Sequence, residues 1–525
     1  MPTGGEALVG ALRALGVEVA FGLPGVHNLA AWKAFPGSGV RLVGVRHEQT
    51  AGYAADGYAR ATGRLGVALT TTGPGAANAV TAVGEAWACH SPVLVVATDV
   101  PSTVRRNGVY RGVLHETTDQ AGFFRPVTKA QLRVPDAAGL AAAVRRAADT
   151  ALEHPRRPVY LEVPTDLLSA QVPAEPEPEP EPPGPPPLAP EVTPLPELTA
   201  ARPLIWAGGG ATASGAGPQV AALARRLGAP VLTSYGGRGL LQPDDLHLVP
   251  LPPHAPEAGA LWDAADLVVV LGSDLDAMNT QGFRQPRPPR VVTVDLAEPV
   301  NLVPDVWVRG DVAPVLDAWL AQLPAADRPP WAPRPARVLE GPEGAFLAAL
   351  EAGLPDGAVV VADMCVPGYW YGGYGRVSGP RGLAYPVGWG TLGFGFPAGL
   401  GAALSGRPTV AVVGDGGFLF ACGDLATAAQ ECLPLTVVLV DDGGYGILAY
   451  DFTKDGEQPV GCDLEPPDFV ALAAAFRVPA REVTVEQLPD AVAAGVASGR
   501  PNLVVLRASY LPPPNTSPRW YRAAG

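Results

Sequence analysis

The chain has 525 residues, a formal net charge of −14 and five cysteines. Hydrophobic cores stop growing at about 250–300 residues, so this length predicts two to four domains. The acidic balance argues against nucleic acid and against anionic membranes as partners. The sequence contains no apolar run long enough for a membrane span, no signal-peptide pattern at its start and no metal-binding spacing of cysteines. We therefore expect a soluble cytoplasmic protein.

A stretch rich in proline and glutamate, residues 171–197, separates the first third of the chain from the rest. This composition favours an extended spacer over a packed core. A second, weaker proline-rich break leads us to expect domains at 1–170, 198–325 and 340–525. In each domain, β-branched runs alternate with stretches rich in alanine and leucine, which is typical of βαβ units. The runs that predict strands are 93–97, 159–163, 267–271, 291–294, 359–361, 409–413, 435–440 and 503–506.

These patterns predict the α/β class, with three doubly wound parallel-sheet domains in series. The first domain contains RHEQTAGYAADGYAR at 46–60, in which Glu48 opens an expected helix with a smooth face of small residues. The helix dipole favours a carboxylate at that end, so taken alone Glu48 is more typical of a structural contact. The turn TTGPGAAN follows at 71–78.

The third domain places acidic residues after two consecutive predicted strands. The first strand ends in Gly414-Asp415-Gly416-Gly417, and the second ends in Asp441-Asp442-Gly443-Gly444. Ligands of parallel sheets lie beyond the carboxyl ends of the strands, so both clusters face one crevice. Glycines allow a phosphate to approach the backbone, and the helix expected to start after Gly417 offers free N–H groups. Carboxylate oxygens on neighbouring loops suit a hard cation such as Mg²⁺.

Together these motifs resemble the thiamine-diphosphate (ThDP) dependent enzymes of the acetolactate synthase-like family, over nearly the whole chain. The resemblance implies a pyrimidine-binding, a central nucleotide-fold and a diphosphate-binding domain, in that order. It implies that Glu48 hydrogen-bonds the aminopyrimidine and promotes a C2-ylid, which attacks the substrate and leads to an enamine. Leu392, within PVGWGTLGFGFPAGLGAALS at 386–405, takes the position of a bulky apolar residue under the thiazolium. By the same match, the cofactor is bound by Gly73, Pro74, Gly75, Gly414, Gly416, Gly417 and Tyr445, and Mg²⁺ by the side chains of Asp415 and Asp442 and the carbonyl of Gly444.

The resemblance also implies a small 2-oxo acid substrate and a homodimer or homotetramer whose active sites lie between subunits. The motifs at 21–29, 112–120 and 458–469 look like the branch that contains 2-ketoarginine (5-guanidino-2-oxopentanoate) decarboxylase. In that branch, His27 and His115 become candidates for catalytic proton transfer. Asp451, Asp455 and Glu457 become candidates for binding a cationic substrate tail, with a solvated acidic loop as the alternative.

Departures from the synthase pattern leave the reaction open. His115 stands where the synthase has glutamine, Met278 where it has arginine, and Asp442 where asparagine is usual beside the metal. The leading hypothesis is an enzyme that cleaves or forms the C–C bond next to a 2-oxo acid carbonyl. The alternatives are simple decarboxylation without carboligation, a flavin-linked oxidase and a catalytically silent paralogue. The glycine-rich stretch 206–217 lacks a complete G-x-G-x-x-G with a downstream acid, so FAD in the central domain remains an unsupported option.

Overall fold

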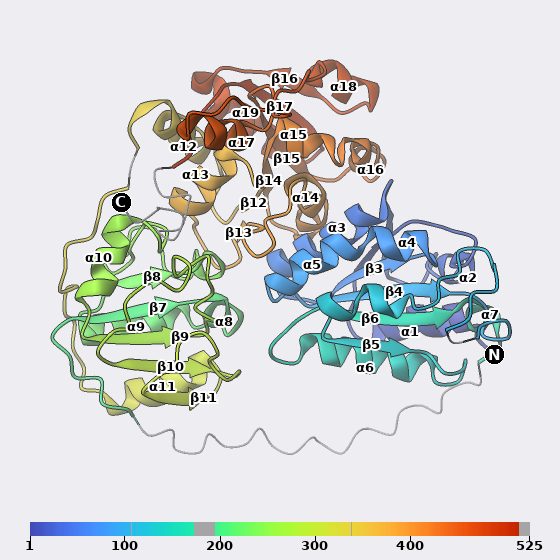
Figure 1. Ribbon diagram of the computed structural model, residues 1–525, viewed down its shortest axis with the longest axis horizontal. Coiled ribbons are helices and arrows are strands. Elements are labelled where there is room, and N and C mark those ends of the chain that lie inside the picture. The colour runs from blue at the N-terminus through green and yellow to red at the C-terminus, as the bar shows by residue number, and fades with distance from the viewer. Residues whose placement is uncertain (107, 173–194, 338, 514–525) are drawn as a thin grey trace.

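A computed structural model describes residues 1–106, 108–172, 195–337 and 339–513, which form three α/β domains (Figure 1). In Figure 1 the first domain lies on the right, the central domain on the left and the third domain above both. Most of the expected spacer, residues 173–194, lies outside the described ranges. Among the helices of those ranges, none combines the length and the apolar character that crossing a membrane requires.

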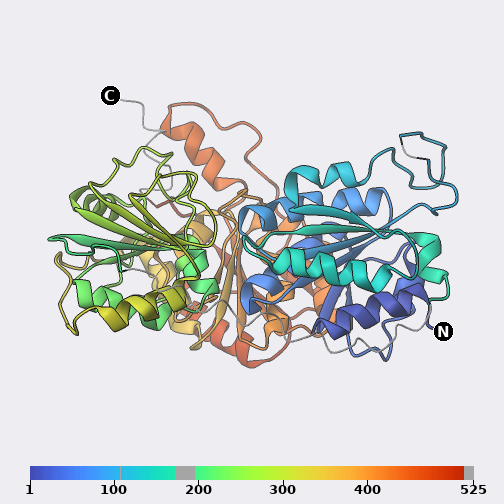
Figure 2. The same ribbon diagram turned by 90° about the horizontal axis from the view of Figure 1, so that it is seen from below.

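The first domain is built on a six-stranded parallel sheet in the order β2-β1-β3-β4-β6-β5. Its strands are β1 (Val19–Gly22), β2 (Arg41–Gly44), β3 (Gly66–Thr70), β4 (Val93–Asp99), β5 (Ala130–Arg133) and β6 (Val159–Pro164). Its helices are α1 (Gly4–Ala14), α2 (Leu29–Trp32), α3 (Glu48–Thr62), α4 (Pro74–Asn78), α5 (Val80–Ala88), α6 (Leu140–Leu152) and α7 (Thr165–Ser169). Strands β3, β4 and β6 are buried along their whole length. Helices therefore cover the sheet on both faces, as Figure 2 shows.

The central domain has a five-stranded parallel sheet in the order β11-β10-β9-β7-β8. Its strands are β7 (Pro203–Ala207), β8 (Val231–Thr233), β9 (Leu267–Leu271), β10 (Val291–Asp295) and β11 (Val306–Arg309). Its helices are α8 (Gly209–Ala213), α9 (Gly217–Leu227), α10 (Pro256–Ala264) and α11 (Val312–Gln322).

The third domain repeats the topology of the first, with the strand order β13-β12-β14-β15-β17-β16. Its strands are β12 (Val359–Ala362), β13 (Leu383–Ala384), β14 (Thr409–Gly414), β15 (Leu435–Asp441), β16 (Ala480–Glu482) and β17 (Asn502–Arg507). Its helices are α12 (Gly341–Gly353), α13 (Val366–Tyr374), α14 (Gly395–Ala402), α15 (Asp415–Leu419), α16 (Leu425–Gln430), α17 (Gly446–Lys454), α18 (Phe469–Ala475) and α19 (Leu488–Ala497). The parallel register pairs Gly414 of β14 with Val440 of β15, so the two acidic clusters leave the sheet side by side.

The prediction of three parallel-sheet α/β domains is confirmed, and every predicted run lies within a strand. The run 267–271 coincides with β9, while the other strands extend one or two residues further. The extensions occur because the hydrogen-bonded ladder continues to the sheet edge after the apolar pattern has stopped, as at Asp99 and Asp441.

The first and third domains meet along α3 and α14, which lie together in Figure 1. A Cβ atom on Gly57 of α3 would overlap with the carbonyl group of Ala398, and one on Gly401 of α14 would overlap with that of Ala54. The backbones of the two helices are therefore in direct contact. The face of small residues predicted for α3 is real, but part of it packs within the first domain, where Gly52 faces Ala82 of α5.

Candidate active site

The acidic pair of the third domain lies where the sequence predicts it. Asp415 is buried, and neither of its carboxylate oxygens has a hydrogen-bond partner among the described residues. Burial raises the pKa of Asp415 to about 7, and the neighbouring carboxylate of Asp442 adds to this shift. Burial also raises the pKa of Asp442. Asp415 is buried and Asp442 is half-buried, and neither carboxylate has an ion pair with a cationic side chain among the described residues. Two such neighbouring carboxylates have the chemistry of a binding site for a hard cation.

The backbone around this pair offers further oxygen atoms. The N–H of Tyr445 donates to the Cys462 carbonyl and the N–H of Leu464 donates to the Gly443 carbonyl, so the carbonyl of Gly444 stays outside this pairing. Within the described residues, no third His, Cys, Asp or Glu completes a cluster with Asp415 and Asp442. A cation held here therefore takes its other ligands from backbone carbonyls, from water or from a bound phosphate, and the residues present fit Mg²⁺ bound with a diphosphate.

The turn after β14 is shaped for a ligand of this kind. Helix α15 begins at Asp415, and not after Gly417 as expected, because Gly414 already takes the position of the N-cap. A Cβ atom on Gly416 would lie 2.7 Å from the Tyr445 ring, which brings the predicted cofactor-binding tyrosine onto the glycine turn. A Cβ atom on Gly417 would lie 3.0 Å from Oδ2 of Asp363, a buried carboxylate at the end of β12.

Asp363 also connects this turn to the segment that carries Leu392. Its Oδ1 accepts hydrogen bonds from the backbone N–H groups of Met364 at 2.8 Å and Phe394 at 3.3 Å. Burial raises the pKa of Asp363 to about 6, and its Oδ2 has no partner in the described part of the chain. Leu392 itself is 38% exposed, which leaves its side chain available to a ligand.

Glu48 is the first residue of α3 and is 6% exposed. Its Oε2 accepts a hydrogen bond from Nδ2 of Asn78 at 2.9 Å. A Cβ atom on Gly75 would lie 3.0 Å from the other carboxylate oxygen of Glu48, so the Gly73-Pro74-Gly75 turn and Glu48 form one wall. The start of α3 is docked on the third domain, because Asp424 accepts hydrogen bonds from the Arg46 N–H at 2.8 Å and the Thr50 hydroxyl at 2.6 Å.

His27 and His115 come together from two separate loops. Their ring centroids are 5.3 Å apart in an edge-to-face arrangement. The Nδ1 atoms of both rings are buried, and no described residue hydrogen-bonds to them. Burial, and then the charge of His115, lowers the pKa of His27. The His115 carbonyl would overlap with a Cβ atom on Gly73, so the histidine pair adjoins the turn beside Glu48.

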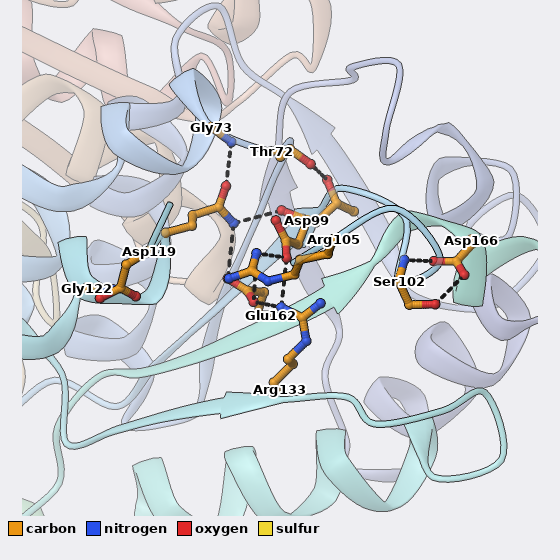
Figure 3. Close-up of polar contacts among 12 residues, drawn as sticks. Thr72, Gly73, Asp99, Ser102, Arg105, Asp119, Gly122, Arg133, Glu162 and Asp166 are labelled. Atoms are coloured by element: carbon orange, nitrogen blue, oxygen red, sulfur yellow. Dashed lines mark hydrogen bonds and ion pairs between the residues drawn. The ribbon is translucent and has the colours of Figure 1, made fainter. Parts of the chain in front are cut away.

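A network of polar side chains in the first domain contacts the Gly73-Pro74-Gly75 turn. In Figure 3, Asp99 and Glu162 point toward the guanidinium groups of Arg105 and Arg133, with Arg133 lying 2.7 Å from Asp99. Gln120 accepts a hydrogen bond from the Gly73 N–H and donates to the Thr98 carbonyl and the Tyr160 hydroxyl. Sequence reasoning missed Gln120, Asn78 and Asp99, because single polar residues in loops and at strand ends carry no periodic signal.

Two further sets of predicted residues lie on α17 and the loop after it, and in the central domain. Asp451 on α17 is ion-paired with Lys454, while Asp455 and Glu457 are exposed. In the central domain, the glycines at 208 and 210 make room for the backbone of Gly272, where a Cβ atom on Gly210 would lie 2.8 Å from the Gly272 Cα atom. These glycines therefore have a packing role, and FAD binding stays an untested option.

Comparison with known proteins defines the class to which this site belongs. Three profiles of thiamine pyrophosphate enzymes match the chain, the N-terminal TPP binding domain at residues 2–123, the central domain at 198–319 and the C-terminal TPP binding domain at 365–506. The chain belongs to the thiamine pyrophosphate enzyme family, and its cofactor is ThDP.

Among its relatives is a probable 2-ketoarginine decarboxylase from Pseudomonas aeruginosa, which is 37% identical over 96% of this chain and 94% of the relative. An acetolactate synthase large subunit from Parasynechococcus marenigrum is 32% identical over 96% of this chain and 87% of the relative. The ThDP-dependent 4-hydroxybenzoylformate decarboxylase of Rhodococcus jostii RHA1 shares the fold with a TM-score of 0.82 at 25% identity, covering 97% of this chain and 100% of the other. The chain is thus an enzyme of the group that contains 2-oxo acid decarboxylases and acetolactate synthases, as its motifs predicted.

Proposed function

We propose that this enzyme is a ThDP- and Mg²⁺-dependent decarboxylase of 2-oxo acids that ends its reaction by protonation. The observation that carries the proposal is the pair His27 and His115, whose rings lie edge to face and of which His115 packs its backbone against the Gly73 turn beside Glu48. After loss of CO₂, the former carbonyl carbon must take up a proton before an aldehyde can leave. Imidazole groups next to the reacting carbon suit this step near neutral pH.

In this proposal the third domain holds the cofactor and its metal. Asp415, Asp442 and the Gly444 carbonyl bind Mg²⁺, and Gly414, Gly416, Gly417 and Tyr445 line the diphosphate. When bound, ThDP supplies a carbon nucleophile for the substrate carbonyl and accepts the electron pair that CO₂ leaves behind. The exposed Leu392 would contact the bound cofactor with its apolar side chain.

The first domain supplies the groups that move protons. Glu48 binds the aminopyrimidine and exchanges a proton with it, in a site whose burial limits access of water. Gly73, Pro74 and Gly75 let the ring approach the backbone. We further propose a homodimer as the smallest active assembly, with Glu48 of one subunit facing the cofactor held by the third domain of the other.

For the substrate, we propose a 2-oxo acid with a cationic tail, of the 2-ketoarginine type. The name of the Pseudomonas aeruginosa relative supports this class, and so do the exposed carboxylates of Asp455 and Glu457. Carboligation of two pyruvate molecules is the second candidate, favoured by the 32% identity to an acetolactate synthase. Against it stands Met278, at the position where the synthase motif has an arginine for the second substrate's carboxylate.

The test is CO₂ release and product analysis with ThDP, Mg²⁺ and a panel of 2-oxo acids that includes pyruvate and 2-ketoarginine. We expect 2-ketoarginine to give the guanidino aldehyde that is one carbon shorter. Acetolactate formed from pyruvate at a comparable kcat/KM would overturn simple decarboxylation in favour of carboligation. A protein that binds ThDP and releases no CO₂ from any member would overturn the proposed activity.

A further inference from the structure

The segment that carries Leu392 is held by a buried carboxylate of another domain. Glu85 lies on α5 of the first domain and is fully buried. Its Oε2 accepts a hydrogen bond from the Trp389 N–H at 3.3 Å and another from the Thr391 hydroxyl at 3.3 Å. The residue directly before Leu392 is therefore bonded to the first domain of the same chain.

Arg60 of α3 extends this contact to both ends of the segment. Its Nη2 lies 3.2 Å from Oε1 of Glu85 and 2.6 Å from Asp56. Its Nη1 donates to the Tyr385 carbonyl at 3.0 Å, and its guanidinium lies 4.8 Å from the centre of the Phe394 ring. Arg60 and Glu85 together thus contact the beginning, the middle and the end of residues 385–394.

The surface of α5 is shaped to receive the same segment. A Cβ atom on Gly84 would overlap with the Trp389 ring, and one on Gly388 would overlap with the Cβ atom of Ala88. Close packing of this kind leaves no room for the segment to shift toward α5. The hydrogen bonds of Glu85 keep it from moving away.

The neighbours of Glu85 require a carboxylate. Oε1 faces the Arg60 guanidinium and the Cys89 thiol at 3.1 Å, and Oε2 faces the Trp389 N–H and the Thr391 hydroxyl. All four neighbours act as donors toward Glu85, and an ionised carboxylate is an acceptor on both oxygens. A glutamine at this position would turn an NH₂ group toward donors on one side.

We propose that Glu85 is a positioning residue that fixes the backbone before Leu392 and thereby sets the place of the Leu392 side chain against the bound cofactor. This inference rests on the proposed role of Leu392 and adds a second contribution of the first domain. Glu48 acts on the cofactor directly, whereas Glu85 acts through the segment 385–394.

The test is a double-mutant cycle of Glu85→Gln and Leu392→Ala, with kcat and the calorimetric Kd for ThDP at saturating Mg²⁺ as readouts. We expect Glu85→Gln to lower kcat or ThDP affinity roughly tenfold in the parent protein, because it weakens two hydrogen bonds to the segment and the contact with Arg60 together. In the Leu392→Ala background the same substitution should have almost no further effect, because the side chain that it positions is absent.

Asp56→Asn is the matched control. Asp56 is also fully buried and also binds Arg60, but none of its hydrogen bonds in the described part of the chain reaches the segment 385–394. Asp56→Asn should therefore lower thermal stability without an effect that depends on Leu392. If the Glu85→Gln protein does not fold, Thr391→Val takes its place in the double-mutant cycle, because it removes one of the two hydrogen bonds between Glu85 and the segment.

If the fold-losses in kcat or ThDP affinity of the two single variants multiply in the double variant, the two residues act independently. That result would overturn the proposal and assign Glu85 a general structural role. Failure of the proposed function has a different signature, because the parent protein would then release no CO₂ while the cycle in ThDP affinity could still be measured. Equal ThDP affinity and turnover in the parent and Leu392→Ala proteins would refute the role of Leu392 and the positioning role together.

Discussion

Replacing Glu48 by glutamine removes one charge from the wall of the proposed site with little other change. Glu48 is the first residue of α3, is almost fully buried and accepts a hydrogen bond from Asn78. Glutamine keeps an oxygen for Asn78 and has nearly the same volume. Glu48→Gln therefore separates the proton chemistry of the side chain from its packing.

The expected cost in stability is small. A carboxylate at a helix N-terminus contributes about 0.3–1 kcal/mol. A hydrogen bond to a charged group exceeds one to a neutral group by about 1 kcal/mol. Removal of a buried charge offsets part of both, so the free energy of unfolding should change by no more than about 1–2 kcal/mol, and Tm by a few degrees.

The expected cost in turnover is much larger, since a positioned acid–base group contributes roughly 10²–10⁴-fold. The assay is CO₂ release at saturating ThDP and Mg²⁺, together with calorimetric ThDP titration and a thermal melt. Glu18→Gln is the control, because Glu18 is an exposed carboxylate of the same domain that pairs with Arg64 at 2.6 Å. Turnover of Glu48→Gln at the level of this control would refute the catalytic role of Glu48.

Three further predictions concern the metal pair, the domain contact and the histidines. Asp442→Asn should weaken binding of Mg²⁺ alone and strengthen binding of ThDP at saturating Mg²⁺, because the anionic diphosphate meets one negative charge fewer; weaker ThDP binding in calorimetry would contradict this charge argument. Gly57→Ala should lower the free energy of unfolding by about 1–3 kcal/mol, because its Cβ overlaps with α14, whereas Gly10→Ala, with nothing within 4 Å, should leave the urea midpoint unchanged or raised. Because the pKa of His27 is lowered from 6.5, the fraction of imidazolium falls as pH rises through a value below 6.5. Since the protonation follows the loss of CO₂, kcat for aldehyde formation should fall over the same range, and a kcat profile that is unchanged in His27→Phe would assign the proton to another group.

The parts of the site that could be predicted from the sequence follow from the geometry of parallel sheets. Asp415 and Asp442 each come directly after a continuous apolar run, and adjacent parallel strands carry such residues to one edge. Glu48 could be placed at a helix start because a polar residue precedes a long stretch of small side chains. The start of α15 was predicted three residues too late, because consecutive glycines hide the position where helical hydrogen bonding begins.

The supporting residues could not be predicted in this way. Glu85 and Trp389 are separated by 304 positions, and Thr50 and Asp424 by 374. Their contacts depend on how two finished domains dock, which no local pattern records. Gln120 and Gly73 lie 47 positions apart within the first domain, and their hydrogen bond likewise depends on the tertiary fold and not on a local pattern. The role of the acidic residues at 451–457 stays a prediction, and the Asp451–Lys454 ion pair adds a partner that the acidic pattern alone did not indicate.

The backbone contact between α3 and α14 has a consequence for recombining this enzyme with its relatives. Gly57 and Gly401 each face a carbonyl group of the opposite helix, so neither position accepts a larger side chain unless its counterpart retreats. A chimaera that joins the first domain of one parent to the third domain of another therefore needs both parents to carry glycine at the positions of Gly57 and Gly401. The same condition holds at the central domain, because a Cβ atom on Gly239 would overlap with the carbonyl group of Gly379 in the third domain. Exchange of any one domain between relatives therefore has to keep the glycines at its contacts with the third domain.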